Sequence, residues 1–537
     1  MKNTPTVNVM LAAAALAAAA CTPAATPPAP TPAPVQPTPP AATAPRGPNV
    51  GSVQIVPLPE SLTVATGAPF VLDSTTAIVT DGGEDASRSG EWLAMLLRKS
   101  TDLAIPVRRG GAGSGHSIRL RLGGRSTLGD EGYELTVSAD SVVIVAQRGA
   151  GLFHGVQTLR QLFPASIESD IGLGDRPTAA PAVHIVDRPR FAWRGGMLDV
   201  ARHFFTVDEV QQYIDIAAMY KLNIVHLHLT DDQGWRIQID SRPLLTTVGS
   251  VSQVGGGQGG YYTKQDWANL VRYASDRYIT LVPELEMPSH INAALTAYPS
   301  IACSTRPTAT YTGTDVGWSA LCVDSAAAMT FIDDVVRDMA AMTPGPYLHI
   351  GGDEVASLTR AQYVRFVERA QDIVTKYGKT MVGWEEISKA RMRPTTIAQQ
   401  WKSDSASAAV AQGAKLIMSP SDRIYVDMKY NSQTELGLDW AAQIEVRQSY
   451  DWDPATYMKG VTEANIVGVE APLWSETVRN ITAAEYLIMP RLPAVAEIGW
   501  TPQASRSWES FRARIAGHAP RWNYLGINYY RSPQIAW

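Results

Sequence analysis

Two adjacent carboxylates, Asp353 and Glu354, follow a short apolar segment and two glycines in the sequence PYLHIGGDE. An apolar strand that buries its side chains has no need of two acids at its end, so the pair is a candidate for chemistry. Gly351 and Gly352 can adopt backbone conformations that other residues avoid, which would let both carboxylates reach one site. The alternative interpretation is an exposed helix N-terminus, where acids interact favourably with the helix dipole.

Paired carboxylates suggest hydrolysis of a glycosidic bond, although adjacent residues fit the usual form of that reaction poorly. A retaining glycosidase places its acid/base and its nucleophile about 5–5.5 Å apart, on different sides of the bond. Neighbours in the sequence, with Cα atoms about 3.8 Å apart, approach from the same side. One of the two can protonate the leaving oxygen, and the nucleophile would then have to come from the substrate itself.

Eight apolar segments rich in β-branched residues alternate with helical patterns and predict a (β/α)8 barrel of class α/β. They span 195–201, 223–230, 278–287, 347–354, 380–386, 396–401, 415–421 and 467–476. Capping boxes at Thr206–Glu209 and Thr482–Glu485 indicate where two of the helices begin. The active site of such a barrel lies at the C-terminal ends of its strands.

The ends of these segments bring polar and aromatic residues to one rim of the predicted barrel. They are Arg202, His203, Asp231, Asp232, His290, Asp353, Glu354, Trp384, Glu385, Trp401, Tyr425, Asp427, Trp474 and Glu476. A barrel with a purely structural role needs none of them there. Their convergence therefore indicates an active site more strongly than any single motif does.

The remaining sequence divides into an N-terminal leader and a second domain. Residues 50–187 mix short alternating strands with two helical segments and predict a small α+β domain, which carries no clustered acids, paired histidines or phosphate-binding loop. The barrel would then occupy 188–537. A hydrophobic content of 45% indicates a chain with material for a large core. A net charge of −5 without a Lys/Arg cluster argues against a nucleic-acid partner.

The leader indicates export. Residues 1–20 have the apolar, small-residue pattern of a signal peptide, and 21–49 form a Pro/Ala/Thr-rich linker. Cys21 at their junction is a candidate for lipid attachment, which predicts a periplasmic or outer-membrane lipoprotein; ordinary secretion is the alternative. Cys303 and Cys322 flank a polar loop and are expected to form a disulfide rather than two free thiols.

Eight motifs resemble a bacterial β-N-acetylhexosaminidase of glycoside hydrolase family 20. They are RGGMLDVARHFF, YKLNIVHLHLTDDQGWRIQI, VPELEMPSH, LHIGGDE, VGWEE, IYVDMKY, GLDWAAQIEVRQSYDWDP and GVEAPLWSE. The resemblance covers about Val53 to Trp537 and implies a zincin-like α+β domain before the catalytic barrel. It also implies an exo-acting, retaining enzyme that releases terminal β-linked GlcNAc or GalNAc from oligosaccharides. The substrate's own acetamide would be the nucleophile, forming an oxazolinium intermediate, with no cofactor and no metal.

The resemblance assigns roles to the residues at the rim. It makes Glu354 the general acid/base and Asp353 the partner of the acetamido N–H, while Tyr425 donates a hydrogen bond to the acetamido oxygen. Asp231 and His290 would support Glu354. The residues expected to bind the sugar are Arg202 and Glu476 at the closed end, Asp427 at a further hydroxyl, and Trp384, Trp401, Trp440 and Trp474 around the ring and acetamide.

Two other functions fit parts of the sequence. His226 and His228, with His290 and His349 on later segments, are also typical of metal-dependent amidohydrolase barrels, although core histidines bonded within the barrel explain them more simply. A non-catalytic sugar-binding lipoprotein would keep the tryptophans and Arg202 but would have no need of Glu354.

Overall fold

The computed structural model of the protein describes residues 53–111, 116–172, 178–303 and 309–537. The expected signal peptide at 1–20, the linker at 21–49 and Cys21 lie outside the described residues. Among the helices of the described ranges, none is both long and apolar enough to cross a bilayer.

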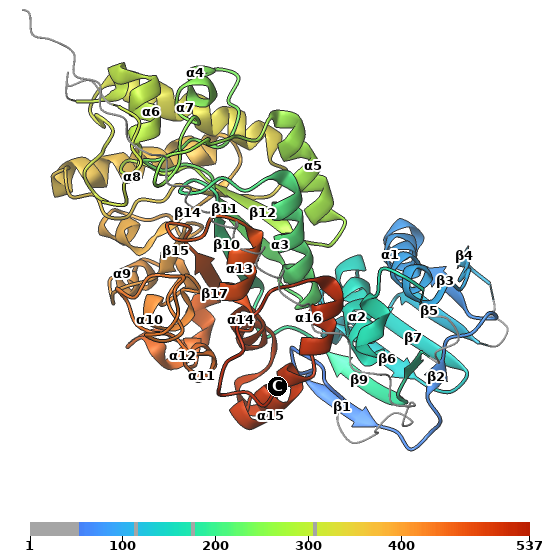
Figure 1. Cartoon of the computed structure of the whole chain (residues 1–537). Coiled ribbons are helices and arrows are strands. Elements are labelled where there is room, and N and C mark those ends of the chain that lie inside the picture. The colour runs from blue at the N-terminus through green and yellow to red at the C-terminus, as the bar shows by residue number, and fades with distance from the viewer. Residues whose placement is uncertain (1–52, 112–115, 173–177, 304–308) are drawn as a thin grey trace, which may run out of the picture. The chain divides into compact units, whose positions relative to one another are not determined.

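Eight parallel strands close into a barrel, which confirms the predicted (β/α)8 architecture (Figure 1). The strands are β10 (Trp193–Asp199), β11 (Ile224–His228), β12 (Thr280–Glu284), β13 (Tyr347–His349), β14 (Thr380–Trp384), β15 (Ile397–Gln400), β16 (Lys415–Met418) and β17 (Ile466–Leu473). β17 pairs with β10 to complete the ring. Nearly every residue of these strands is buried, because side chains of a helix-covered barrel are enclosed on both faces.

Helices surround the barrel and follow most of its strands. They are α3 (Val207–Met219), α4 (Leu244–Thr247), α5 (Lys264–Ser275), α6 (Asn292–Ala297), α7 (Ala326–Met342), α8 (Arg360–Lys376), α9 (Ala406–Ala411), α10 (Ser421–Ile424), α11 (Val446–Tyr450), α12 (Pro454–Tyr457), α13 (Ile481–Ile488), α14 (Arg491–Trp500), α15 (Trp508–Ala516) and α16 (Ala519–Leu525). The capping box predicted at Thr206–Glu209 is present at the start of α3.

The capping box predicted at Thr482–Glu485 is wrong. The N-cap of α13 is Asn480, whose side chain accepts a hydrogen bond from the Ala483 N–H. Asparagine satisfies a free N–H of the first turn as well as threonine does, so the helix begins before Thr482. The segment from Ile481 to Trp500 forms two helices, α13 and α14, because Pro490 has no N–H to continue the hydrogen-bond ladder.

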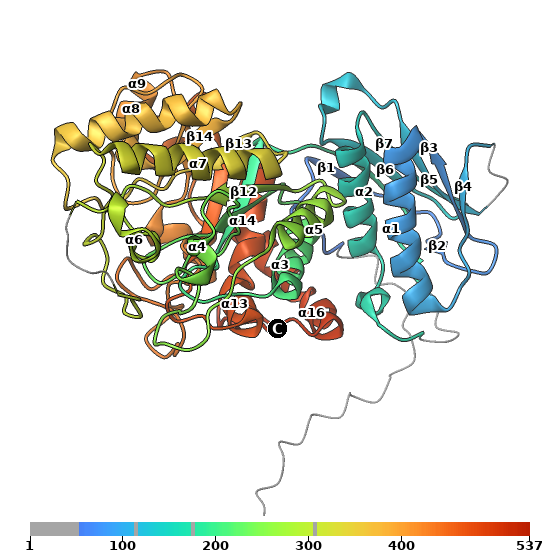
Figure 2. The same ribbon diagram turned by 90° about the horizontal axis from the view of Figure 1, so that it is seen from above.

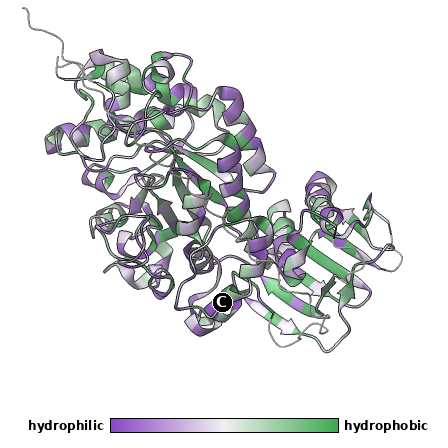
Figure 3. Ribbon diagram, in the orientation of Figure 1, coloured by the Kyte–Doolittle hydropathy of each residue, from purple (hydrophilic) through white to green (hydrophobic). Residues whose placement is uncertain are grey.

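Residues before the barrel form a seven-stranded mixed sheet with two helices packed side by side on it (Figure 2). The order of its strands is β1 (Ser61–Val64), β9 (Val183–Asp187), β6 (Tyr133–Val137), β7 (Ser141–Ala146), β5 (Ser117–Leu122), β3 (Ala77–Asp81) and β4 (Val107–Arg109), and the helices are α1 (Gly83–Thr101) and α2 (Gly149–Leu162). A separate two-stranded pair joins β2 (Phe70–Val71) and β8 (Ala179–Ala180). Figure 3 shows hydrophobic residues concentrated on the strands of the barrel and of the seven-stranded sheet.

Candidate active site

A cavity of about 460 Å³ is lined by residues from the loops that follow the barrel strands. This is the end of the barrel at which the sequence predicts chemistry. Its lining includes most of the predicted site residues: Arg202, His290, Asp353, Glu354, Trp401, Tyr425, Trp440, Trp474 and Glu476. The loops also contribute Thr314, Val316, Lys402, Leu438 and Thr477, which the sequence did not single out.

Three of the residues with a predicted role lie next to this lining instead of in it. Trp384 is fully buried, packs against the Trp474 ring at 5.7 Å between ring centroids, and donates its Nε1–H to Glu284. Asp427 is also buried, and its pKa is raised well above the usual range by burial and by the nearby Glu476 carboxylate. Asp231 contacts the lining through its ion pairs with other site residues.

The two adjacent carboxylates sit on a loop and not on a strand, which corrects the predicted strand 347–354. β13 ends at His349 because Gly351 and Gly352 have left-handed backbones, with φ of 68° and 97°. A Cβ on Gly351 would lie 1.7 Å from the carboxylate of Glu286, so only glycine fits there. The prediction that these glycines release the chain from strand geometry is confirmed.

Asp353 and Glu354 differ in pKa although they are neighbours. Burial, together with the negative charge of Glu354, raises the pKa of Asp353 to about 6, against an opposing effect of His290. The pKa of Glu354 is lowered, because His290 lies beside it with Nε2 3.5 Å from Oε2. Environments that separate the pKa values of two acids are typical of acid/base sites.

His290 is held between two acids. Its Nδ1 lies 3.4 Å from Asp231 Oδ1, on the side opposite Glu354. Burial opposes the charge of this imidazole, but Asp231 outweighs that effect and raises the pKa of His290 well above the usual range. The predicted grouping of Asp231, His290 and Glu354 is therefore present in the structure.

Arg202 forms a buried charge network in the lining of the cavity. Its Nη2 lies 2.8 Å from Asp231 Oδ2, and its Nη1 donates to Asp199 Oδ2 at 3.2 Å. Asp199 ends β10 and also accepts the backbone N–H of Arg202, so it fixes the direction of the side chain. Arg202 Nε has no hydrogen-bond partner among the described residues.

Several buried polar atoms near the cavity lack a hydrogen-bond partner among the described residues. They are Arg202 Nε, Asp353 Oδ1, both carboxylate oxygens of Asp427, and Glu476 Oε2. Leaving a buried polar group unpaired costs about 1–3 kcal/mol, so such a cluster indicates a ligand that supplies polar groups. Aromatic rings stand beside them, with Trp401 and Tyr425 stacked at an interplanar angle of 12°. Polar atoms and flat rings together suit a sugar.

Glu386 and Lys402 lie near the cavity but were not among the predicted residues. Glu385 was predicted there, but it accepts hydrogen bonds from Ser403 and the Trp401 backbone and so has a structural role. Glu386 instead accepts the Trp401 Nε1–H, and burial together with the charge of Asp353 raises its pKa to about 8. The sequence signal for Glu386 was a second acid directly after Trp384 and Glu385.

The disulfide between Cys303 and Cys322 is confirmed, with Cα atoms 4.5 Å apart. The segment that it closes carries Thr314 and Val316 in the cavity lining. The same segment is fixed to the barrel rim where Ser319 donates to Asp232. The bridge therefore holds part of the cavity wall.

Replacing Cys303 and Cys322 by serine is expected to lower the free energy of unfolding by about 3 kcal/mol through loop entropy. KM should rise several-fold, because Thr314 and Val316 would lose their fixed position. Chemical denaturation and steady-state kinetics measure the two effects. Cys21→Ser is the matched control, and an equal loss in that variant would show that the bridge is not responsible.

The histidines that suggested a metal site lie inside the barrel. His226, His228 and His349 are buried, and each has a nitrogen against the carboxylate of Glu284. Among the described residues that line the cavity, none of these three appears. His226, His228 and His349 are therefore buried histidines bonded to a carboxylate within the barrel.

A closed barrel with two acids of separated pKa and aromatic walls at its C-terminal rim defines a hydrolase that acts on carbohydrates. Residues 191–503 match the catalytic domain of glycosyl hydrolase family 20, and residues 52–188 match domain 2 of the same family. The chain therefore belongs to glycosyl hydrolase family 20.

Individual relatives are similar to this chain over most of its length. The β-N-acetylhexosaminidase of Cellulomonas fimi is 44% identical over 489 residues, which cover 90% of this chain and 97% of the relative. The structure of the family 20 β-N-acetylhexosaminidase of Streptomyces coelicolor A3(2) is 48% identical, with a TM-score of 0.87 and coverage of 90% and 99%. A mutant β-hexosaminidase of Streptomyces plicatus in complex with its product GlcNAc is also 48% identical, with a TM-score of 0.87 and coverage of 90% and 98%.

Proposed function

We propose that the protein is an exo-acting, retaining β-N-acetylhexosaminidase that releases terminal β-linked GlcNAc or GalNAc by substrate-assisted catalysis. The observation that carries this proposal is the placement of Asp353 and Glu354 side by side at one cavity, with Tyr425 in the same lining. Adjacent residues cannot flank a glycosidic bond as acid and nucleophile. The acetamide of the substrate is the group that supplies the nucleophile.

In the first step the acetamido oxygen attacks C1, and the bond from C1 to the leaving oxygen breaks. Glu354 protonates the leaving oxygen with the proton that it shares with His290. Asp353 accepts the acetamido N–H on its unpaired Oδ1, and its negative charge stabilises the cationic oxazolinium ring. Tyr425 donates its O–H to the acetamido oxygen. In the second step Glu354 takes a proton from water, which attacks C1 and restores the acetamide.

The remaining cavity residues bind one sugar ring and close the site beyond it. Arg202 and Glu476 offer an unpaired N–H and an unpaired carboxylate oxygen to hydroxyls of the non-reducing end. Asp427 offers two free oxygens for a further hydroxyl. Trp401 and Trp474 line the ring and acetamide, with Trp384 supporting Trp474 from the buried side, and Trp440, half exposed, contacts the leaving group.

We also propose that the protein is exported and attached to a membrane only through a lipid on Cys21. The signal-peptide pattern before Cys21 and the linker after it support this proposal. The disulfide between Cys303 and Cys322 supports an oxidising compartment. Metabolic labelling with a radioactive fatty acid in the wild type and in Cys21→Ser tests the lipid, since only the wild type should be labelled.

The function is tested by comparing an aryl 2-acetamido-2-deoxy-β-glucoside with the corresponding plain β-glucoside at equal concentration. The acetamido substrate is expected to be cleaved at least about 10³-fold faster, because only it carries the nucleophile. Release of the aryl alcohol is followed by absorbance. Equal cleavage of both substrates would contradict substrate assistance and would require a second protein carboxylate as nucleophile.

A further inference from the structure

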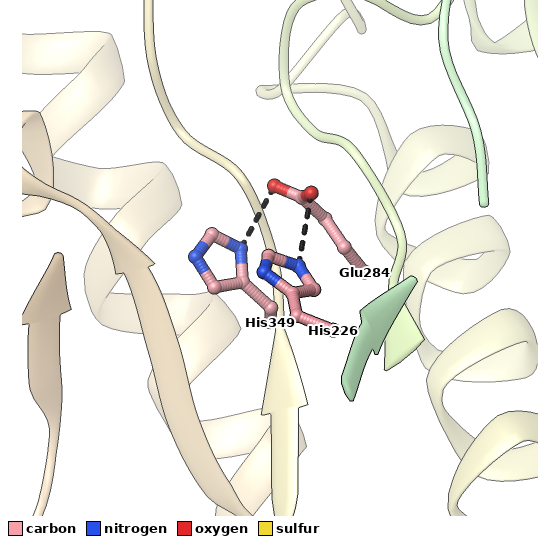
Figure 4. A group of neighbouring side chains, drawn as sticks. All are labelled: His226, Glu284 and His349. Carbon is pink, nitrogen blue, oxygen red and sulfur yellow. Dashed lines mark ion pairs between the residues drawn. The ribbon is translucent and has the colours of Figure 1, made fainter. Parts of the chain in front are cut away.

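Glu284 is a buried charge that contacts three histidines, and the mechanism above does not use it. It ends β12, is fully buried, and faces imidazoles from two neighbouring strands. Figure 4 shows one oxygen of Glu284 directed at His226 and the other at His349. The distances are 3.1 Å to His226 Nε2 and 2.9 Å to His349 Nδ1. His228 Nδ1 contacts the same carboxylate.

Glu284 belongs to a continuous series of alternating acids and histidines that ends at the general acid. We call this series the acid–histidine chain, and its members in order are Glu470, His226, Glu284, His228, Asp231, His290 and Glu354. Successive side chains approach within 3.5 Å at every link. All members except Glu354 are at most 3% exposed, so water screens their charges little.

The members of the acid–histidine chain carry alternating charges. Burial alone would lower the pKa of His228, but the charge of Glu284 and the contact with Asp231 raise it to about 10. His226 follows the same pattern, with Glu470 and Glu284 raising its pKa to about 9. The pKa of Glu284 is lowered well below the usual range, because its three histidine neighbours outweigh the effect of burial.

Glu284 also affects groups outside the acid–histidine chain. Its charge contributes to the raised pKa values of the buried carboxylates Glu286 and Asp353. Its second oxygen accepts the Nε1–H of Trp384 at 2.9 Å, and Trp384 packs against the cavity wall. Glu284 therefore contacts His228, which belongs to the series that ends at the general acid, and Trp384, which supports the cavity wall.

We propose that Glu284 is a positioning residue of the active site, which acts through the acid–histidine chain to set the proton affinity of Glu354. Its negative charge holds His228 as a cation, and that cation orients Asp231 on His290. The negative charge of Glu284 also opposes loss of the proton that His290 and Glu354 share. The alkaline limit of activity is then set partly by a residue that never touches the substrate. This proposal rests on the proposed function, in which Glu354 is the general acid.

The test is the pH dependence of kcat/KM for the aryl acetamido substrate in three variants. Glu284→Gln removes a negative charge, so the alkaline limb should move to lower pH by on the order of half to one unit. His228→Gln removes a positive charge from the same chain, so its limb should move to higher pH. Trp384→Phe removes the other hydrogen bond to Glu284 without a charge change, so it should raise KM and leave the limb in place.

Opposite shifts in the two charge variants would support the proposal, since general damage to the structure does not reverse sign with charge. A folded Glu284→Gln variant whose limb coincides with the wild type would overturn it. If Glu284→Gln does not fold, His228→Gln decides, with an unmoved limb again overturning the proposal. If neither folds, ¹⁵N spectra of the nine histidines in the wild type decide, because neutral His226 and His228 at pH 8 would overturn it.

Failure of the proposed function gives a different result. A wild-type enzyme that does not prefer the acetamido substrate contradicts the role of Glu354 itself. A wild type with that preference, together with unmoved limbs in the variants, contradicts only the role of Glu284.

Discussion

Glu354→Gln is expected to lower kcat/KM for an aryl 2-acetamido-2-deoxy-β-glucoside by about 10²–10⁴-fold, because glutamine keeps the shape of the side chain but cannot deliver a proton. The loss should depend on the leaving group. A 2,4-dinitrophenolate leaves without protonation, so the variant should lose less than about tenfold with that substrate. With a second sugar as leaving group, the loss should be greatest.

Glu385→Gln is the matched control for this prediction. It makes the same carboxylate-to-amide change at the same rim, but Glu385 bonds to Ser403 and to the Trp401 backbone. Its effect should be similar for all leaving groups. A Glu354→Gln variant that loses the same factor with dinitrophenol and with a sugar leaving group would contradict the role of Glu354 as general acid. Thermal unfolding of each variant separates loss of chemistry from loss of structure.

Asp353→Asn is expected to lower kcat by about 10²–10³-fold, since the cationic ring of the intermediate would lose its buried counter-charge. The preference for the acetamido substrate over the plain glucoside should fall with it. The pH profile provides a second measurement. Asp353 must be ionised to act, and burial raises its pKa to about 6. The wild type should therefore lose activity as the pH falls through about 6, and the variant should lack this limb.

Glu386→Gln controls for another acid near the cavity, whose pKa is raised to about 8. Glu386 contacts Trp401, so this variant should change KM while keeping the acidic limb. An acidic limb that persists in Asp353→Asn and disappears in Glu386→Gln would contradict the assignment to Asp353.

The barrel could be predicted from the sequence because its strands are buried on both faces and read as continuous apolar segments. The rim residues followed from the strand ends alone, as the positions of Arg202, Asp353 and Glu354 show. The break between α13 and α14 was not predicted, although Pro490 was visible, because apolar periodicity continues across it. The start of α13 was also predicted wrongly, because a local hydrogen bond to the side chain of Asn480 sets it.

Residues that act through other residues were harder to find. Glu284 lies within the apolar motif VPELEM of a predicted strand and was assigned no role. Two acids in a buried strand were nevertheless a signal, since a buried charge requires partners. Those partners come from β11, β13 and β14, and only the folded barrel brings them together. Trp384 was predicted to line the cavity, but its indole turns toward Glu284. That direction could not be predicted either, because only the folded barrel brings Glu284 beside it.

Both Glu354 and His290 have left-handed backbones, with φ of 50° and 51°. A side chain with a Cβ loses about 1–2 kcal/mol in this conformation, whereas glycine loses almost nothing. Glycine is the residue that adopts this conformation without strain, yet a carboxylate and an imidazole occupy these two positions. The backbone energy lost at Glu354 and His290 is therefore stability that the fold gives up in order to place the proton donor and its partner.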